Sequence, residues 1–162
     1  MSVTFNADEI FAIAEQIERN GARFYRKAAE GAAGETGKDM LLGLAEMEDA
    51  HEKTFAAMRA ELSAGDKGGI SFDPDDEGEK FLQAVADGHI FDTKVDPSEK
   101  LTGSETLAQI LTTAIGLEKD SVVFYLGIKN AVGNALGKDK IDGIIAEEMS
   151  HVALLSSKLA TV

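Results

Sequence analysis

Two glutamate–histidine pairs are the residues of this chain whose types and spacing could do chemistry. Glu48 lies three residues before His51, and the same pair returns one hundred positions later as Glu148 and His151. The chain has only three histidines, so most of them belong to these pairs. Residues three apart on a helix share one face, so each pair would present a carboxylate and an imidazole in the same direction. Helical bundles present metal ligands in this way.

Four long amphipathic stretches must position these pairs. Apolar residues recur in steps of three and four, and this pattern predicts helices over about 6–32, 38–62, 104–131 and 138–160. Asn6 and Glu9 have the spacing of a capping box at the start of the first helix. Glu48 and His51 occupy successive inward positions of the second helix, with apolar residues on either side. We therefore expect both side chains inside a bundle.

The first and third predicted helices each carry a carboxylate and a phenol on the inward stripe. Glu18 precedes Tyr25 by seven residues, and Glu118 precedes Tyr125 by the same interval. A buried phenol needs a hydrogen-bond partner, and a carboxylate that binds a metal is a suitable one. We interpret both tyrosines as residues that support a metal site, although a core-filling role explains them equally well.

The two halves of the chain form an internal repeat. A shift of one hundred positions aligns the glutamates, tyrosines and histidines of the two halves without a gap. Each half predicts one helical hairpin, over about 6–62 and about 104–160. Two such hairpins make an all-α four-helix bundle with approximate two-fold symmetry. We expect residues 1–162 to form this single domain.

The segment of about 63–102 that joins the hairpins differs in composition. It is rich in glycine and aspartate, which breaks the helical periodicity. A short helix is expected over 76–86. A crossover of this length can return the chain along the bundle, so the second and third helices could be parallel neighbours. We interpret His89 and the acidic run 73–79 as solvated loop residues.

The predicted inward polar set needs positive charge. Burying four carboxylates without compensation would cost many kcal/mol, and their repulsion would keep some of them protonated. Two divalent cations would balance the set. Oxygen and imidazole ligands without thiolate suit iron or manganese, and a zinc site is the remaining alternative. The predicted ligands are Glu18, Glu48, His51, Glu118, Glu148 and His151. Glu48 and Glu148 can bridge the two metals. Glu18 and His51 would complete one metal and the remaining two residues the other, but the packing of the helices decides which helix serves which metal.

The overall charge argues against two classes of partner. The chain has 29 acidic and 16 basic residues, for a net charge of −13. Nucleic acids and anionic membrane surfaces are bound by clustered lysine and arginine, so we expect neither. Acidity favours cations, although solubility explains it equally well.

Cysteine is absent from the chain. This excludes disulfides, thiol catalysis, and zinc-finger or iron–sulfur sites. No apolar segment follows a basic region at the start, and no apolar run approaches about 18 residues. We expect a cytoplasmic protein.

These motifs resemble the ferritin-like superfamily, and most closely the rubrerythrin family. The matching residues are Glu18 with Tyr25, Glu118 with Tyr125, Glu-Asp-Ala-His at 48–51 and Glu-Met-Ser-His at 148–151. The stretch 117–131, LEKDSVVFYLGIKNA, is similar to the third helix of stand-alone rubrerythrin-like proteins. The resemblance implies a non-haem di-iron carboxylate protein, usually a homodimer, that reacts with peroxide or dioxygen.

Two features depart from that family. Peroxide-reducing rubrerythrins commonly have a further carboxylate one turn after the glutamate of the third helix, where this chain has Ser121. They also carry a cysteine-ligated rubredoxin domain that delivers electrons, so this chain would need a separate electron donor. Ser121 and its counterpart Gly21 are small, and we expect them to leave space over the metals for water, dioxygen or peroxide.

Three functions fit the sequence. The first is a di-iron oxidoreductase of rubrerythrin type that reduces peroxide or dioxygen with external electrons. The second is an iron-binding or storage protein of ferritin or bacterioferritin type, with ferroxidase activity. The third is a non-catalytic metal-binding bundle.

Overall fold

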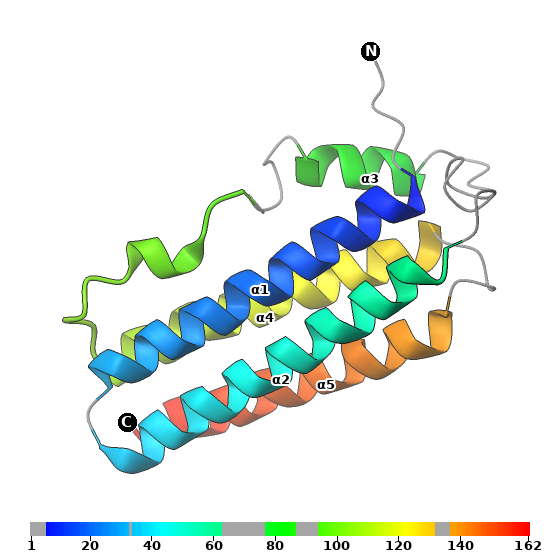
Figure 1. Ribbon diagram of the computed structural model, residues 1–162. Helices are drawn as coiled ribbons and strands as arrows, with labels where there is room; N and C mark the ends of the chain where they lie inside the picture. The colour runs from blue at the N-terminus through cyan, green and yellow to red at the C-terminus, as the bar shows by residue number, and fades with distance from the viewer. Residues whose placement is uncertain (1–5, 33, 63–76, 87–93, 132–136) are drawn as a thin grey trace.

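The computed structural model describes residues 6–32, 34–62, 77–86, 94–131 and 137–162, and within these ranges every regular element is a helix (Figure 1). The four long helices are α1 (Ala7–Gly31), α2 (Glu35–Ala60), α4 (Leu107–Ala131) and α5 (Lys138–Leu159). Two short helices, α3 (Glu77–Ala86) and η2 (Pro97–Lys100), belong to the segment between the hairpins. The predicted all-α four-helix bundle and the short helix near 76–86 are confirmed.

Local side-chain chemistry sets where the helices begin. At α1 the predicted capping box is present, because the Glu9 amide donates to Asn6 Oδ1 at 2.9 Å and the Asn6 amide donates to Glu9 Oε2 at 3.1 Å. Helix α4 begins three residues later than predicted. Thr106 forms the same reciprocal arrangement with Gln109, at 2.9 and 3.2 Å, and so fixes the start of this helix.

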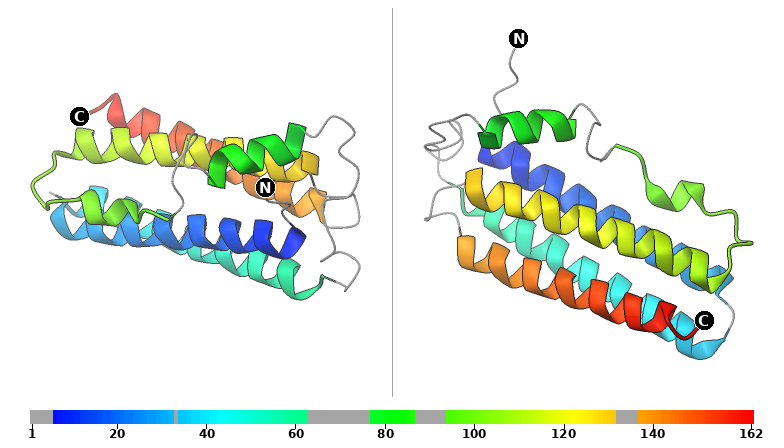
Figure 2. Two further views of the ribbon diagram at one scale, coloured as in Figure 1. Left: turned by 90° about the horizontal axis from the view of Figure 1, so that it is seen from above. Right: turned by 180° about the vertical axis from the view of Figure 1, so that it is seen from behind.

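The two hairpins pack side by side in antiparallel pairs. Helix α1 packs on α2 and α4 on α5, while α4 also lies beside α1 and α5 beside α2 (Figures 1 and 2). Helices α2 and α4 run in the same direction, as expected, but they occupy opposite corners of the bundle. The expectation that they could be neighbours is therefore wrong, because the crossover places α4 against α1.

The apolar core is divided into two layers. Each layer contains buried aliphatic and aromatic side chains from all four long helices. The layer beside α3 includes Phe11, Phe55, Leu82, Ile128 and Ile141, and the opposite layer includes Phe24, Leu41, Leu44, Leu111 and Leu155. Between the layers lies a polar zone at the middle of the bundle, which is where the predicted ligands fall.

Helix α3 lies against α4 near one end of the bundle (Figure 2). A Cβ atom added at Gly127 would lie 2.2 Å from the ring of Phe81, so the missing side chain of this glycine allows the close approach. Leu82 and Val85 are buried below. His89 and most of the acidic run 73–79 lie outside the described residues. Among the helices that the structure does describe, none is both long and apolar enough to cross a membrane.

Candidate metal centre

The six predicted ligands meet in the polar zone of the bundle. Glu18 comes from α1, Glu118 from α4, and α2 and α5 each contribute one glutamate–histidine pair. Each of the six residues is at most 4% exposed. They form two groups of four, and within each group one ligand atom per residue lies within 4.8 Å of the others. The first group is Glu18, Glu48, His51 and Glu148, and the second is Glu48, Glu118, Glu148 and His151.

Glu48 and Glu148 belong to both groups. This is the arrangement expected of two bridging carboxylates, each of which has two oxygens for two neighbouring cations. Of the remaining residues, Glu18 and His51 belong to the first group, and Glu118 and His151 belong to the second. The two imidazole rings stack, with their centroids 5.8 Å apart, so the two groups are adjacent.

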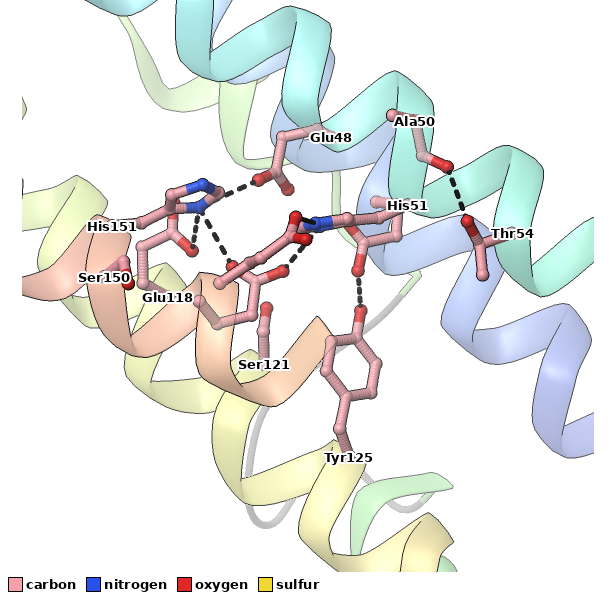
Figure 3. Close-up of polar contacts among 12 residues, drawn as sticks. Glu48, Ala50, His51, Thr54, Glu118, Ser121, Tyr125, Ser150 and His151 are labelled. Atoms are coloured by element: carbon pink, nitrogen blue, oxygen red, sulfur yellow. Dashed lines mark hydrogen bonds and ion pairs between the residues drawn. The ribbon is translucent and has the colours of Figure 1, made fainter. Parts of the chain in front are cut away.

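Both histidines direct Nδ1 toward the carboxylates (Figure 3). His51 Nδ1 lies 2.8 Å from Glu148 and 3.4 Å from Glu18. His151 Nδ1 lies 3.2 Å from Glu148, 3.5 Å from Glu118 and 3.6 Å from Glu48. These are ion-pair distances, but neither Nδ1 atom makes a well-aligned hydrogen bond.

The buried side-chain nitrogen and oxygen atoms that lack a hydrogen-bond partner, among the described residues, all belong to this cluster. They include both Nδ1 atoms, both oxygens of Glu148, and one oxygen each of Glu18 and Glu48. Buried polar atoms rarely remain unpartnered in folded proteins, because each one costs free energy. Lone pairs that converge without donors are what a cation requires. The donor set therefore fits a pair of divalent metal ions with oxygen and imidazole ligands.

The protonation of the cluster leads to the same conclusion. Burial and the neighbouring carboxylates raise the pKa of Glu48 well above its usual range, and they raise the pKa of Glu118 to about 8. Burial alone would lower the histidine pKa values, but contacts with the carboxylates raise them to about 11 for His51 and about 9 for His151. Glu148 has a lowered pKa despite its burial, because Glu118 and both imidazoles contact it. The cluster holds protons that cations would replace.

The two tyrosines bond across the hairpins. The Tyr25 hydroxyl donates to Glu118, and the Tyr125 hydroxyl donates to Glu18. Side chains on a helix lean toward its N-terminus, so each phenol leans back from its own helix toward the polar zone. The sequence predicted a carboxylate partner for each phenol but not this exchange between halves.

Gly21 makes room for one shared carboxylate. A Cβ atom added there would lie 2.5 Å from Glu48 Oε2. At the equivalent position, Ser121 is buried and its hydroxyl donates to the carbonyl of Leu117 at 3.1 Å. A side chain at position 21 would thus compete directly with Glu48 for space.

A cavity of about 300 Å³ leads from the surface to the second group. It lies between α1, α4 and η2. Glu48, Glu118 and Tyr25 form its inner wall, and both small residues, Gly21 and Ser121, line it. The other lining residues are Ile17, Asn20, Val95, Pro97, Lys100, Leu117 and Asp120. The expected space beside the small residues is present, and it is large enough for several water molecules.

The crossover supplies one wall of this cavity. Arg23 pairs with Asp96 at 3.3 Å, and Lys27 donates to the Ser98 carbonyl at 2.8 Å, which holds η2 against α1. Asp96 also accepts from the Ser98 amide at 2.8 Å and caps η2. The sequence predicted no functional role for this segment, because a capped turn does not indicate which helix it will cover.

Glu147 is a further residue that the sequence interpretation missed. Its carboxylate lies 2.7 Å from His51 Nε2, on the outer side of the ring. The adjacent ligand candidate Glu148 explains why it was overlooked, since two successive glutamates cannot both face the same centre. A glutamate one residue before a predicted ligand was the only available signal.

Comparison with known proteins supports the fold. No family model matches the chain, and no curated protein matches it. The chain is similar to a solved structure from Thermotoga maritima, described as a candidate ferritin-like diiron-carboxylate protein. The TM-score is 0.71 at 24% sequence identity, over 97% of this chain and 96% of that one. The chain therefore has the ferritin-like fold that its motifs predicted.

Proposed function

We propose that the protein is a non-haem di-iron oxidoreductase of rubrerythrin type, which reduces peroxide or dioxygen with electrons from a separate donor. The observation that carries this proposal is that four buried carboxylates and two buried imidazoles converge, and that three of the carboxylates and both imidazoles have polar atoms without a hydrogen-bond partner. The ferritin-like fold and the description of its Thermotoga maritima neighbour agree with a di-iron centre.

The two groups of candidate ligands support one position for each ion. Glu18 and His51 would hold one iron, Glu118 and His151 would hold the other, and Glu48 with Glu148 would bridge them. When bound, an iron pair supplies two one-electron redox changes, which together provide the electron pair that a peroxide bond needs for its reduction. The protein's part is to fix the spacing and charge of that pair.

The cavity supports a small oxidant as the substrate. It reaches Glu118 and Tyr25 from the surface, so a small oxidant such as hydrogen peroxide or dioxygen has a path to the second group. Burial, followed by the nearby carboxylates, raises the pKa of Tyr25 well above its usual value. The phenol therefore keeps its proton at neutral pH and holds it at the cavity wall, where reduction of an oxidant consumes protons.

Electron supply must come from outside the chain. Cysteine is absent, so the chain contains no thiolate-ligated iron that could pass electrons to the site. We propose a separate protein or small-molecule donor, because the sequence contains no cysteine for a rubredoxin domain, and a homodimeric assembly, which the family resemblance implies.

The experiment is peroxide consumption by the iron-loaded protein in the presence of a reductant. We expect Glu48→Ala and His151→Ala to abolish turnover, because each removes a ligand, while Glu46→Gln on the exposed side of α2 leaves it unchanged. If both ligand variants were as active as the parent, the site assignment would fail.

Oligomer size, iron content and peroxide consumption distinguish the other two functions from the proposed one. A storage protein would elute as a large multimer that holds many irons per chain, whereas the proposed oxidoreductase should be a small oligomer with about two. A non-catalytic bundle would bind metal without consuming peroxide. Either result would replace the proposed activity.

A further inference from the structure

The outer sides of the two histidines differ, although the inner sides match. His51 Nε2 lies 2.7 Å from the carboxylate of Glu147. His151 Nε2 is buried and has no hydrogen-bond partner. A shift of one hundred positions places Met47 opposite Glu147 in the repeat, and a methionine side chain offers no carboxylate to an imidazole. The repeat is therefore broken at this position.

The difference bears on how each ring can bind a cation. Both rings direct Nδ1 toward the shared carboxylates, so a neutral imidazole that offers its Nδ1 lone pair must carry its proton on Nε2. In that tautomer the Nε2–H of His51 donates a hydrogen bond to Glu147. Such a partner fixes the tautomer, orients the ring and makes the ligating nitrogen more basic. His151 has no acceptor for its Nε2 proton, and an unpartnered buried donor costs free energy.

We propose that Glu147 is a positioning residue that makes the group containing His51 the tighter of the two metal positions, so that the ions load in a fixed order. This inference rests on the proposed dimetal function. The group containing His151, which loads second, is the one that the cavity reaches through Glu48 and Glu118. The ion facing the substrate path is then the weaker-held of the pair.

The test is an equilibrium titration of the metal-free full chain with Co²⁺ under anaerobic conditions. Calorimetry and the visible spectrum monitor the binding. We expect the parent to bind two ions in two steps whose affinities differ about tenfold or more. Glu147→Met should weaken the first step by about 10- to 100-fold, so that the two steps merge. The effect should lie near the lower end of this range, since the Glu147 side chain is 56% exposed.

Two further variants separate positioning from a general effect of charge or folding. Glu147→Gln keeps an acceptor oxygen without the charge, so its first step should fall between those of the parent and Glu147→Met. Met47→Glu should supply the missing acceptor to His151 and tighten the second step about tenfold. Glu46→Met, which removes one exposed negative charge from α2, should change neither step.

Coincident steps in the parent, or an unchanged first step in Glu147→Met, would overturn the inference while leaving a dimetal centre in place. If the parent bound no Co²⁺ at all, the proposed function itself would fail with it. Thermal unfolding of each metal-free variant shows whether a change in binding is instead a change in folding.

Discussion

The hydroxyl of Tyr125 donates its hydrogen bond to the carboxylate of Glu18, so a phenol of one hairpin holds a ligand candidate of the other. Tyr25 and Glu118 form the mirrored contact. Both phenols are buried, and each bond joins α1 to α4. The two hairpins are thus connected at the ligand candidates, in addition to the apolar packing above and below them.

The Tyr125 contact should contribute measurably to stability. Tyr125→Phe removes the donor and leaves a buried carboxylate without it, which should lower the free energy of unfolding by about 1–3 kcal/mol. Tyr25→Phe should cost less, because Tyr25 lines the cavity and a water molecule can replace its hydroxyl. Urea denaturation of the two metal-free variants measures the difference. Equal losses would contradict the role assigned to the cavity.

Gly21→Ala should separate metal binding from stability. The new Cβ atom would meet Glu48 Oε2 at 2.5 Å, and a carboxylate at the end of a flexible side chain can move aside without disturbing the backbone. We expect metal affinity to fall about tenfold. The free energy of unfolding of the metal-free chain should not fall, because the gain in helix propensity offsets the cost of moving Glu48.

Gly116→Ala is the matched control for that variant. Gly116 lies within α4, and a Cβ atom added there would have no neighbour within 4 Å. We expect it to stabilise the chain by about 1 kcal/mol through helix propensity and to leave metal affinity unchanged. A loss of affinity in both variants would mean that the effect is general to glycine replacement.

The metal-free protein should lose stability as the pH rises from 6 to 9. The pKa of His151 is raised from 6.5 to about 9, because its carboxylate contacts outweigh its burial, and burial raises that of Glu118 from 4.5 to about 8. The folded chain then holds more protons than the unfolded chain across this interval, so its stability falls with pH.

Each titrating group loses its contribution to the free energy of unfolding over its own pH range. The contribution of His151 is complete below about pH 6.5 and is lost as the pH passes about 9, while that of Glu118 is lost between about pH 4.5 and 8. Glu148 has a lowered pKa and adds no slope above pH 6. Urea unfolding of chelator-treated protein should show a loss of at least about 1 kcal/mol. A constant or rising free energy of unfolding would refute the prediction.

Bound metal should reverse that pH trend. Cations compete with protons for the same oxygens and nitrogens, so their affinity rises with pH. At a free metal concentration of about 100 times the dissociation constant, binding should add about 2.7 kcal/mol of stability. Thermal unfolding with and without Mn²⁺ at pH 6 and pH 8 measures this, and a stabilisation that was greater at the lower pH would argue against these ligands.

The cluster of buried carboxylates and imidazoles was predictable because two independent patterns coincide on its residues. Glu48 and His51 occupy the apolar stripe of their helix, and the repeat places Glu148 and His151 in the same register. Burial of a charged residue at a core position demands compensation, so the stripe alone indicates an unusual role. The capping box at Asn6 involves residues only three apart in the sequence, so it was also predictable, and the structure contains it.

Other features depend on contacts between segments that are distant in sequence. Helices α2 and α4 run parallel but lie at opposite corners of the bundle. The length of the crossover predicts their relative direction, but it does not predict which corner α4 occupies. The exchange of tyrosine partners and the position of η2 over the cavity follow from that same packing. Glu147 contacts His51 from another hairpin, so no spacing within one helix could have indicated it.

The central claim is that two groups of ligands hold two metal ions per chain. Its most direct test is metal analysis of the protein loaded anaerobically with Fe²⁺ and then oxidised, together with its optical spectrum, for the parent and for Glu48→Ala. We predict two irons per chain and a near-ultraviolet band from an oxo-bridged ferric pair, with iron content and band both lost in Glu48→Ala. Less than one iron per chain in the parent, or an unchanged iron content in Glu48→Ala, would contradict it.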